Sequence, residues 1–175
     1  PYFLFVGNRM GYKNFDFMIL SIYHMIKKDY DLICIGGGKF TKMETLLFDK
    51  LGISRSIIRY DLNEDLLSTF YQNAVALIYP SKYEGFGLPL LEAFESKCPV
   101  ICGNGGSLKE IGGEAPLYFE YNKIKSIGKC IESLTSDKKI REKVIKMGLI
   151  QYEKFSWRKT ANETAKFYED VLKKL

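Results

Sequence analysis

The chain has 175 residues, 46% of them hydrophobic and 27% charged, a composition that fits one globular domain and excludes an intrinsically disordered chain. Its longest apolar runs are far shorter than the roughly 20 residues that a membrane-spanning helix needs. The formal charge of +5 would suit a polyphosphate, an anionic membrane or nucleic acid, but the scatter of the basic residues favours an ordinary solvated surface, and we expect no nucleic-acid partner.

Short apolar runs alternate with amphipathic segments of helical length. Strands are predicted at residues 2–6, 32–35, 57–59, 74–78, 99–102 and 117–119, and helices at 14–27, 42–51, 63–71 and 88–96. Asn63 is the expected N-cap of the third helix. After about residue 124 only helices are predicted, with a break near Gly148 and a last helix from about Trp157 to the end. Strands that are apolar on both sides and alternate with helices predict an α/β fold with a doubly wound, mostly parallel, Rossmann-like sheet.

The chain begins at Pro1 and enters the first strand without a methionine or a signal peptide, so we expect it to be part of a longer protein. No repeat or linker divides residues 1–175, which we interpret as a single domain. The four cysteines lack zinc-like spacing and are interpreted as small buried hydrophobic residues, which suits a reducing cytoplasm. No metal or other cofactor is expected.

The segment from Tyr79 to Phe94 follows a predicted strand and begins a helix. Gly85 and Gly87 would allow the backbone to approach a ligand closely, and Pro89 suits a first helical turn. The free N–H groups of Phe86, Gly87 and Leu88 would then form an anion site at the helix N-terminus.

Two acids frame this turn. Glu84 precedes the glycines and Glu92 lies eight residues later in the helix. Carboxylates accept hydrogen bonds from the vicinal hydroxyls of sugars and riboses. A solvated Glu84 and a Glu92 that only complements the helix dipole are the structural alternative.

Arg9 and Lys13 follow the first strand in a loop that also contains Gly7 and Gly11. In a parallel sheet this loop lies at the edge where ligands bind. Cations at this edge would stabilise a departing diphosphate, and the alternative is a pair of solvated surface cations.

These motifs resemble the C-terminal domain of the family 4 retaining glycosyltransferases, which have the GT-B fold. The likeness extends over four segments, namely residues 6–14, 84–92, 103–111 and 155–157. The resemblance implies that Arg9 and Lys13 hold the diphosphate of a nucleotide-sugar donor, that Glu92 binds its ribose and that Glu84 binds the hydroxyls of the transferred sugar. It assigns the remaining donor contacts to Gly7, to the N–H groups of Phe86, Gly87 and Leu88, and to a loop that reads the nucleobase edge and contains Tyr60 and Leu62.

The resemblance also implies metal-independent transfer with retention at the anomeric centre, and an N-terminal partner domain that brings the acceptor. That domain is absent here, so we expect the isolated chain to be inactive, and contact with the inner membrane surface through the partner domain stays open. Bacterial polysaccharide biosynthesis is the expected setting. A non-catalytic nucleotide-binding module and a sugar-nucleotide epimerase of the same architecture remain alternatives. The glycines at 36–38 are predicted to form a tight turn beside the nucleotide, and the dinucleotide fingerprint of dehydrogenases is missing.

Overall fold

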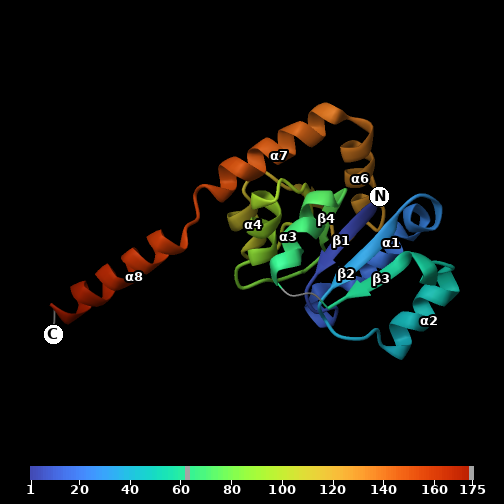
Figure 1. The fold of residues 1–175 in the computed structure, drawn as a ribbon, viewed down its shortest axis with the longest axis horizontal. Helices are drawn as coiled ribbons and strands as arrows, with labels where there is room; N and C mark the ends of the chain where they lie inside the picture. Colours follow the sequence, from blue (N-terminus) through green and yellow to red (C-terminus); the bar gives the residue numbers. More distant parts are fainter. Residues whose placement is uncertain (62–63, 174–175) are drawn as a thin grey trace.

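The computed structural model describes residues 1–61 and 64–173. Its centre is a six-stranded sheet in which every neighbouring pair is parallel, in the order β3-β2-β1-β4-β5-β6 (Figure 1). The strands are β1 (Tyr2–Val6), β2 (Asp31–Ile35), β3 (Ile57–Tyr60), β4 (Ala76–Tyr79), β5 (Val100–Gly103) and β6 (Leu117–Phe119). This order is that of the doubly wound Rossmann fold, and it confirms the predicted fold class.

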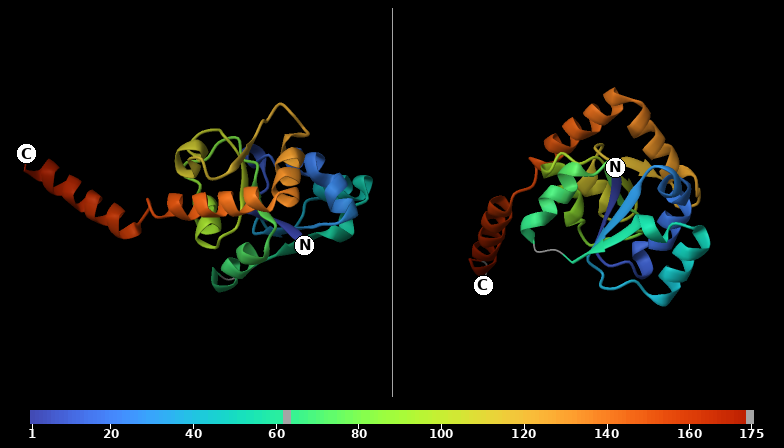
Figure 2. Two further views of the ribbon diagram at one scale, coloured as in Figure 1. Left: turned by 90° about the horizontal axis from the view of Figure 1, so that it is seen from above. Right: turned by 45° about the vertical axis from the view of Figure 1, so that its right-hand side comes forward.

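Helices cover both faces of the sheet. They are α1 (Phe15–Lys28), α2 (Lys42–Leu51), α3 (Glu64–Asn73), α4 (Leu88–Glu95), α5 (Leu108–Gly112), α6 (Ser126–Ser136), α7 (Lys138–Tyr152) and α8 (Trp157–Leu172), with short 3-10 turns η1 (Gly11–Lys13) and η2 (Ser54–Ser56). Figure 2 shows α8 projecting away from the body, and every residue of this helix is exposed. No helix in the described part of the chain is long and apolar enough to cross a membrane.

Alternation along the strands produces two separate cores. Phe3 and Phe5 of β1 belong to the core beneath α1, α2 and α6, while Leu4 between them belongs to the core beneath α3, α4 and α5. Successive side chains of a strand point to opposite faces, and both faces here are apolar because helices cover both. The same alternation continues in β2, where Cys34 joins the first core and Ile33 the second.

The predicted break near Gly148 is wrong. Helix α7 continues through Gly148 as far as Tyr152, and the break before the last helix lies at residues 153–156. An earlier break lies at Asp137, whose side chain caps α7 by accepting from the Lys139 N–H at 2.8 Å. Gly148 instead allows α7 to approach α4, because a Cβ atom there would lie 2.8 Å from Cδ1 of Phe94. The predicted N-cap Asn63 lies outside the described residues.

Candidate functional site

The carboxyl ends of β1 and β4 meet at the point where the strand order reverses. Such a switch point is where open parallel sheets bind ligands, because the loops from the two strands leave in opposite directions. The two loops are joined here by a hydrogen bond of 2.8 Å from the Lys82 N–H to the Tyr12 carbonyl. Any ligand-binding group that these loops carry is therefore held close to the others.

Lys13 and Glu84 come together at this switch point. Nζ of Lys13 lies 2.7 Å from Oε1 of Glu84, and the two side chains are only 13% and 10% exposed. Lys13 ends the turn η1, and the left-handed conformation of Asn14 (φ 56°) starts α1 immediately afterwards. Nζ of Lys13 also donates to the Tyr79 hydroxyl at 3.2 Å. The structure thus pairs the predicted cation with the predicted sugar-binding acid.

The glycine turn before α4 is formed as expected at Gly87, whose φ of 106° is open to glycine and strained for other residues, and a proline occupies the first turn of the helix. Gly85 has no positive φ, so its backbone does not require glycine. Within residues 1–61 and 64–173, no hydrogen bond occupies the N–H groups of Phe86, Gly87 or Leu88. These donors lie at the positive end of the α4 dipole.

The loop before α4 is held in place by residues of the loop that follows β5. The Ser107 hydroxyl lies 2.9 Å from the carbonyl oxygen of Glu84 and 2.8 Å from that of Phe86. A Cβ at Gly105 would lie 2.4 Å from the Lys82 carbonyl oxygen, so the two loops are in backbone contact. The loop after β5, which contains Gly105 and Ser107, was singled out in the sequence only through the family resemblance. Its role in holding Glu84 in place was not predicted.

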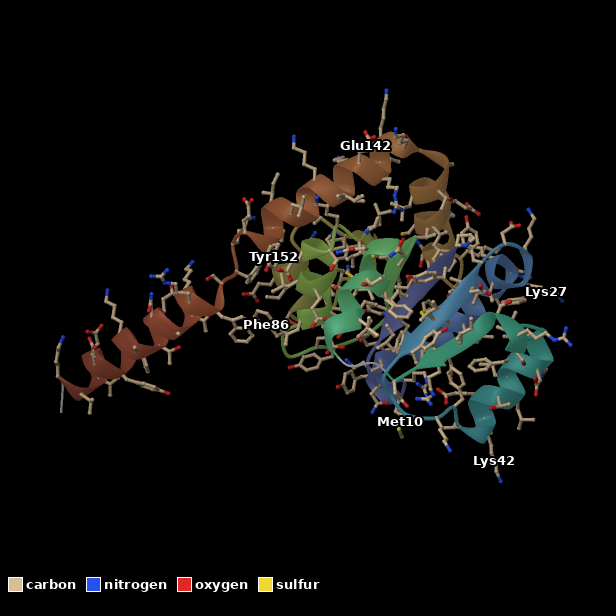
Figure 3. The ribbon with its side chains drawn as sticks, in the orientation of Figure 1. Met10, Lys27, Lys42, Phe86, Glu142 and Tyr152 are labelled. Carbon is tan, nitrogen blue, oxygen red and sulfur yellow. The ribbon has the colours of Figure 1, made fainter. Side chains whose placement is uncertain are left out.

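Glu92 lies on α4, half-buried, and its Oε2 accepts a hydrogen bond of 2.8 Å from the Tyr71 hydroxyl. A groove of about 460 Å³ runs beside it, between α4 and the junction of α7 with α8. Phe86 and Tyr152, labelled in Figure 3, both line it. The groove brings Phe86, Leu88 and Glu92 together, whereas Lys13 and Glu84 are not among its lining residues.

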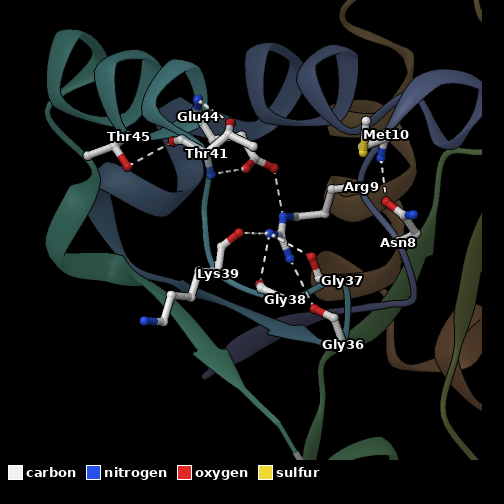
Figure 4. Close-up of polar contacts among 10 residues, drawn as sticks. All are labelled: Asn8, Arg9, Met10, Gly36, Gly37, Gly38, Lys39, Thr41, Glu44 and Thr45. Carbon is white, nitrogen blue, oxygen red and sulfur yellow. Dashed lines mark hydrogen bonds and ion pairs between the residues drawn. The ribbon is translucent and has the colours of Figure 1, made fainter.

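The Arg9 side chain is buried among internal partners. It is 3% exposed, and Nε lies 2.7 Å from Oε1 of Glu44 at the start of α2. The other guanidinium nitrogens donate to the carbonyl oxygens of the glycine turn after β2, as Figure 4 shows, namely those of Gly36, Gly37, Gly38 and Lys39. Cζ lies 4.7 Å from the centre of the Phe40 ring. Internal partners therefore surround the guanidinium in this structure, and the expectation that Arg9 faces the diphosphate beside Lys13 stays a prediction.

The turn that Arg9 holds requires glycine. Gly36, Gly37 and Gly38 have φ values of 82°, 72° and 68°, and a Cβ at Gly37 would lie 2.7 Å from Nη1 of Arg9. The predicted tight turn is thus confirmed, with carbonyl groups facing Arg9. Burial acts to raise the pKa of Glu44, but the hydrogen bond from the Thr41 N–H and the Arg9 guanidinium outweigh it and hold that pKa below its usual value.

The remaining predicted contacts lie along the same edge of the sheet. Gly7 follows β1 with a φ of 114°, and its N–H donates to the Ile35 carbonyl at 2.9 Å. Tyr60 ends β3 and is 41% exposed, with its ring centre 5.2 Å from that of Phe70. Leu62 lies outside the described residues. Among the described residues no cluster of three or more His, Cys, Asp or Glu side chains could hold a metal ion.

Two buried tyrosines contact the predicted site and were not predicted from the sequence. Tyr79 contacts Lys13, and Tyr71 contacts Glu92. Both looked like ordinary core residues because they occupy apolar stretches, and both are 1% exposed. Only the position of Tyr79 directly before Pro80, at the ligand end of a strand, signalled a role.

Comparisons with known proteins identify the family of this chain. The family described as glycosyl transferases group 1 matches residues 1–149. The O-antigen chain mannosyltransferase B of Escherichia coli is 32% identical over 174 residues, which cover 96% of this chain and 45% of that protein. The chain therefore spans about half the length of this relative.

Solved structures share the fold. The C-terminal domain of a glycosyl transferase group 1 family protein from Francisella tularensis superposes with a TM-score of 0.74 at 25% identity, over 87% of this chain and 85% of that one. The pneumococcal O-GlcNAc transferase GtfA, solved in complex with UDP and GlcNAc, superposes with a TM-score of 0.80 at 18% identity, over 98% of this chain and 36% of that one. The chain belongs to the group 1 glycosyltransferases, with the Rossmann-like architecture of a GT-B domain.

Proposed function

We propose that this chain binds the nucleoside-diphosphate sugar donor of a glycosyltransferase that transfers a sugar to an acceptor hydroxyl with retention and without a metal ion. The observation that carries the proposal is the Lys13–Glu84 pair at the switch point between β1 and β4. Glu84 stands in the loop that leads to the N–H groups at the start of α4, which donate no hydrogen bond within the described residues. This combination offers positive charge for a diphosphate and a carboxylate for sugar hydroxyls.

The chemistry needs charge stabilisation on the departing nucleoside diphosphate. The Lys13 ammonium and the N-terminus of α4 supply that positive charge from fixed positions, which is the role a metal ion has in other transferases. In the absence of donor Glu84 neutralises Lys13, and a bound diphosphate would share the ammonium with it. Glu92 would accept hydrogen bonds from the ribose hydroxyls. The acceptor and any further catalytic groups would come from the part of the protein that this chain does not contain.

The names of related proteins indicate which donor sugars and bases to test first. One is a mannosyltransferase by name, and one structural neighbour was solved with UDP and GlcNAc. We therefore place mannosyl transfer first and test the base and the sugar together, with a panel that contains GDP-mannose, UDP-glucose, UDP-GlcNAc and ADP-glucose.

Calorimetric titration of the chain with this panel, in the presence of EDTA, tests donor binding. Lys13→Ala should weaken binding of the preferred donor by roughly tenfold or more, because a charge-assisted contact contributes about 1.5 to 3 kcal/mol. Glu92→Ala should weaken nucleoside binding as well. Lys138→Ala, which removes an exposed lysine that pairs with Glu142 on α7, is the matched control and should bind as the wild type does. Lack of binding to every member of the panel would contradict the proposal.

The full-length protein tests the reaction. Incubation with the preferred donor and an acceptor glycan in EDTA should release nucleoside diphosphate, and NMR of the product should show the donor's anomeric configuration. An epimerised nucleotide sugar in place of a glycoside would overturn the proposed transfer, and an inverted product would overturn the retaining part. A strict requirement for a divalent cation would overturn the metal-independent part.

A further inference from the structure

Tyr79 lies beneath the Lys13–Glu84 pair. It is the last residue of β4 and is 1% exposed, and its hydroxyl accepts a hydrogen bond from Nζ of Lys13 at 3.2 Å. Burial raises the pKa of Tyr79 far above its usual value, and the nearby charge of Glu84 raises it further. The phenol therefore stays neutral. Its oxygen accepts from the Lys13 ammonium, which in turn pairs with Glu84 at 2.7 Å.

Tyr71 contacts the other acid, Glu92, directly. It lies near the end of α3, is 1% exposed and donates its hydroxyl proton to Oε2 of Glu92 at 2.8 Å. Burial, followed by the charge of Glu92, raises the pKa of Tyr71 well above its usual value, so this phenol also stays neutral. Tyr71 and Tyr79 belong to one buried cluster between the sheet and helices α3 and α4 (Figure 1).

A neutral hydroxyl is well suited to hold a ligand-binding carboxylate. The terminal torsion of a glutamate is broad, so a free carboxylate samples many orientations. A phenol that donates to one oxygen restricts this rotation and leaves the other oxygen for a ligand hydroxyl. Unlike a cation, it does so without neutralising the carboxylate. Preorganisation of this kind raises affinity because the ordering is complete before the ligand arrives.

We infer that Tyr71 and Tyr79 are separate positioning residues of the donor site, Tyr71 acting on the nucleoside through Glu92 and Tyr79 acting on the transferred sugar through Lys13, which holds Glu84. This inference rests on the proposed function, since it assigns the two acids to ribose and sugar. It predicts that the two tyrosines affect different parts of the same ligand.

Two affinity ratios measured on the full-length protein separate these parts. The ribose ratio compares the dissociation constant of a 2′,3′-dideoxynucleoside diphosphate with that of the ribonucleoside diphosphate. The sugar ratio compares the nucleoside diphosphate with its sugar conjugate. The probes are GDP, 2′,3′-dideoxy-GDP and GDP-mannose, or the uridine series with UDP-glucose if the wild type binds UDP more tightly.

Tyr71→Phe should lower the ribose ratio by about 3- to 10-fold and change the sugar ratio by less than about 2-fold, because one hydrogen bond is lost at one end of the ligand. Tyr79→Phe should instead lower the sugar ratio by about 3- to 10-fold and change the ribose ratio by less than about 2-fold. Tyr71→Phe should have no further effect on the ribose ratio in a Glu92→Gln background, since Tyr71 acts through that carboxylate. Tyr118→Phe is the matched control, because it removes a half-buried hydroxyl that donates to the Gly113 carbonyl at 2.7 Å.

The melting temperature of each variant shows whether it folds, and phenylalanine keeps the buried ring. If either tyrosine variant lowers both ratios equally, or leaves its own ratio unchanged, the positioning roles are wrong. A wild-type protein that binds none of the probes would instead refute the proposed function, and the inference with it.

Discussion

The placement of Arg9 gives the sharpest test of this structure. Replacement by alanine removes one partner of an ion pair whose side chains are 3% and 10% exposed, and it leaves Glu44 charged without its guanidinium. Loss of one partner from a buried pair costs about 3 to 5 kcal/mol. The four carbonyl groups that Arg9 binds belong to a turn whose residues are mostly exposed, so water can replace most of those hydrogen bonds. We therefore expect Arg9→Ala to lower the free energy of unfolding by about 3 to 5 kcal/mol.

For a chain of this size each kcal/mol shifts the melting temperature by about 2 to 4 °C, so the loss should be roughly 6 to 20 °C in a thermal melt followed by circular dichroism. Arg55→Ala, which removes an exposed arginine of η2, should change the free energy of unfolding by less than about 0.5 kcal/mol. The double variant Arg9→Ala/Glu44→Ala should lose less than the sum of the two single losses.

Nucleotide binding separates this role from a direct contact with the diphosphate. Folded Arg9→Ala should lose less affinity for the preferred nucleoside diphosphate than Lys13→Ala does. Unchanged stability, together with a loss of affinity as large as that of Lys13→Ala, would show that Arg9 faces the ligand and would refute the internal placement.

Two further predictions concern stability. Because the pKa of Glu44 is held below its usual value, its contribution to the free energy of unfolding is complete at neutral pH and is lost as the pH falls through the folded-state pKa. The difference between wild type and Glu44→Gln in urea unfolding should therefore shrink between about pH 7 and about pH 3, and a constant difference would contradict this. Gly148→Ala should cost about 1 to 3 kcal/mol, because its Cβ would lie 2.8 Å from Phe94. Gly128→Ala, where the nearest atom is 3.7 Å away in a helix, should be neutral or should stabilise by up to about 1 kcal/mol in the same denaturant titration.

The sequence predicted the elements and their arrangement well because those depend on local patterns. Alternating apolar and amphipathic segments fixed the order of strands and helices, and runs apolar on both sides indicated a sheet covered on both faces. The break near Gly148 failed because a glycine in a helix can signal either a stop or a close contact. Only the approach of Phe94 from α4 decides between them.

The candidate site likewise combines features that follow from the sequence with features that only the tertiary structure decides. Sequence alone determined that Lys13, Glu84 and the turn at Gly87 lie at the ligand edge, because each follows a parallel strand, and strand ends share one edge. Tertiary structure decided which way each side chain turns. Arg9 and Lys13 are four residues apart in one loop, yet Arg9 turns towards Glu44 on α2 and Lys13 towards Glu84 after β4. Their partners lie 35 and 71 residues away in the chain, so pairing follows from how the helices pack on the sheet, which no local pattern encodes.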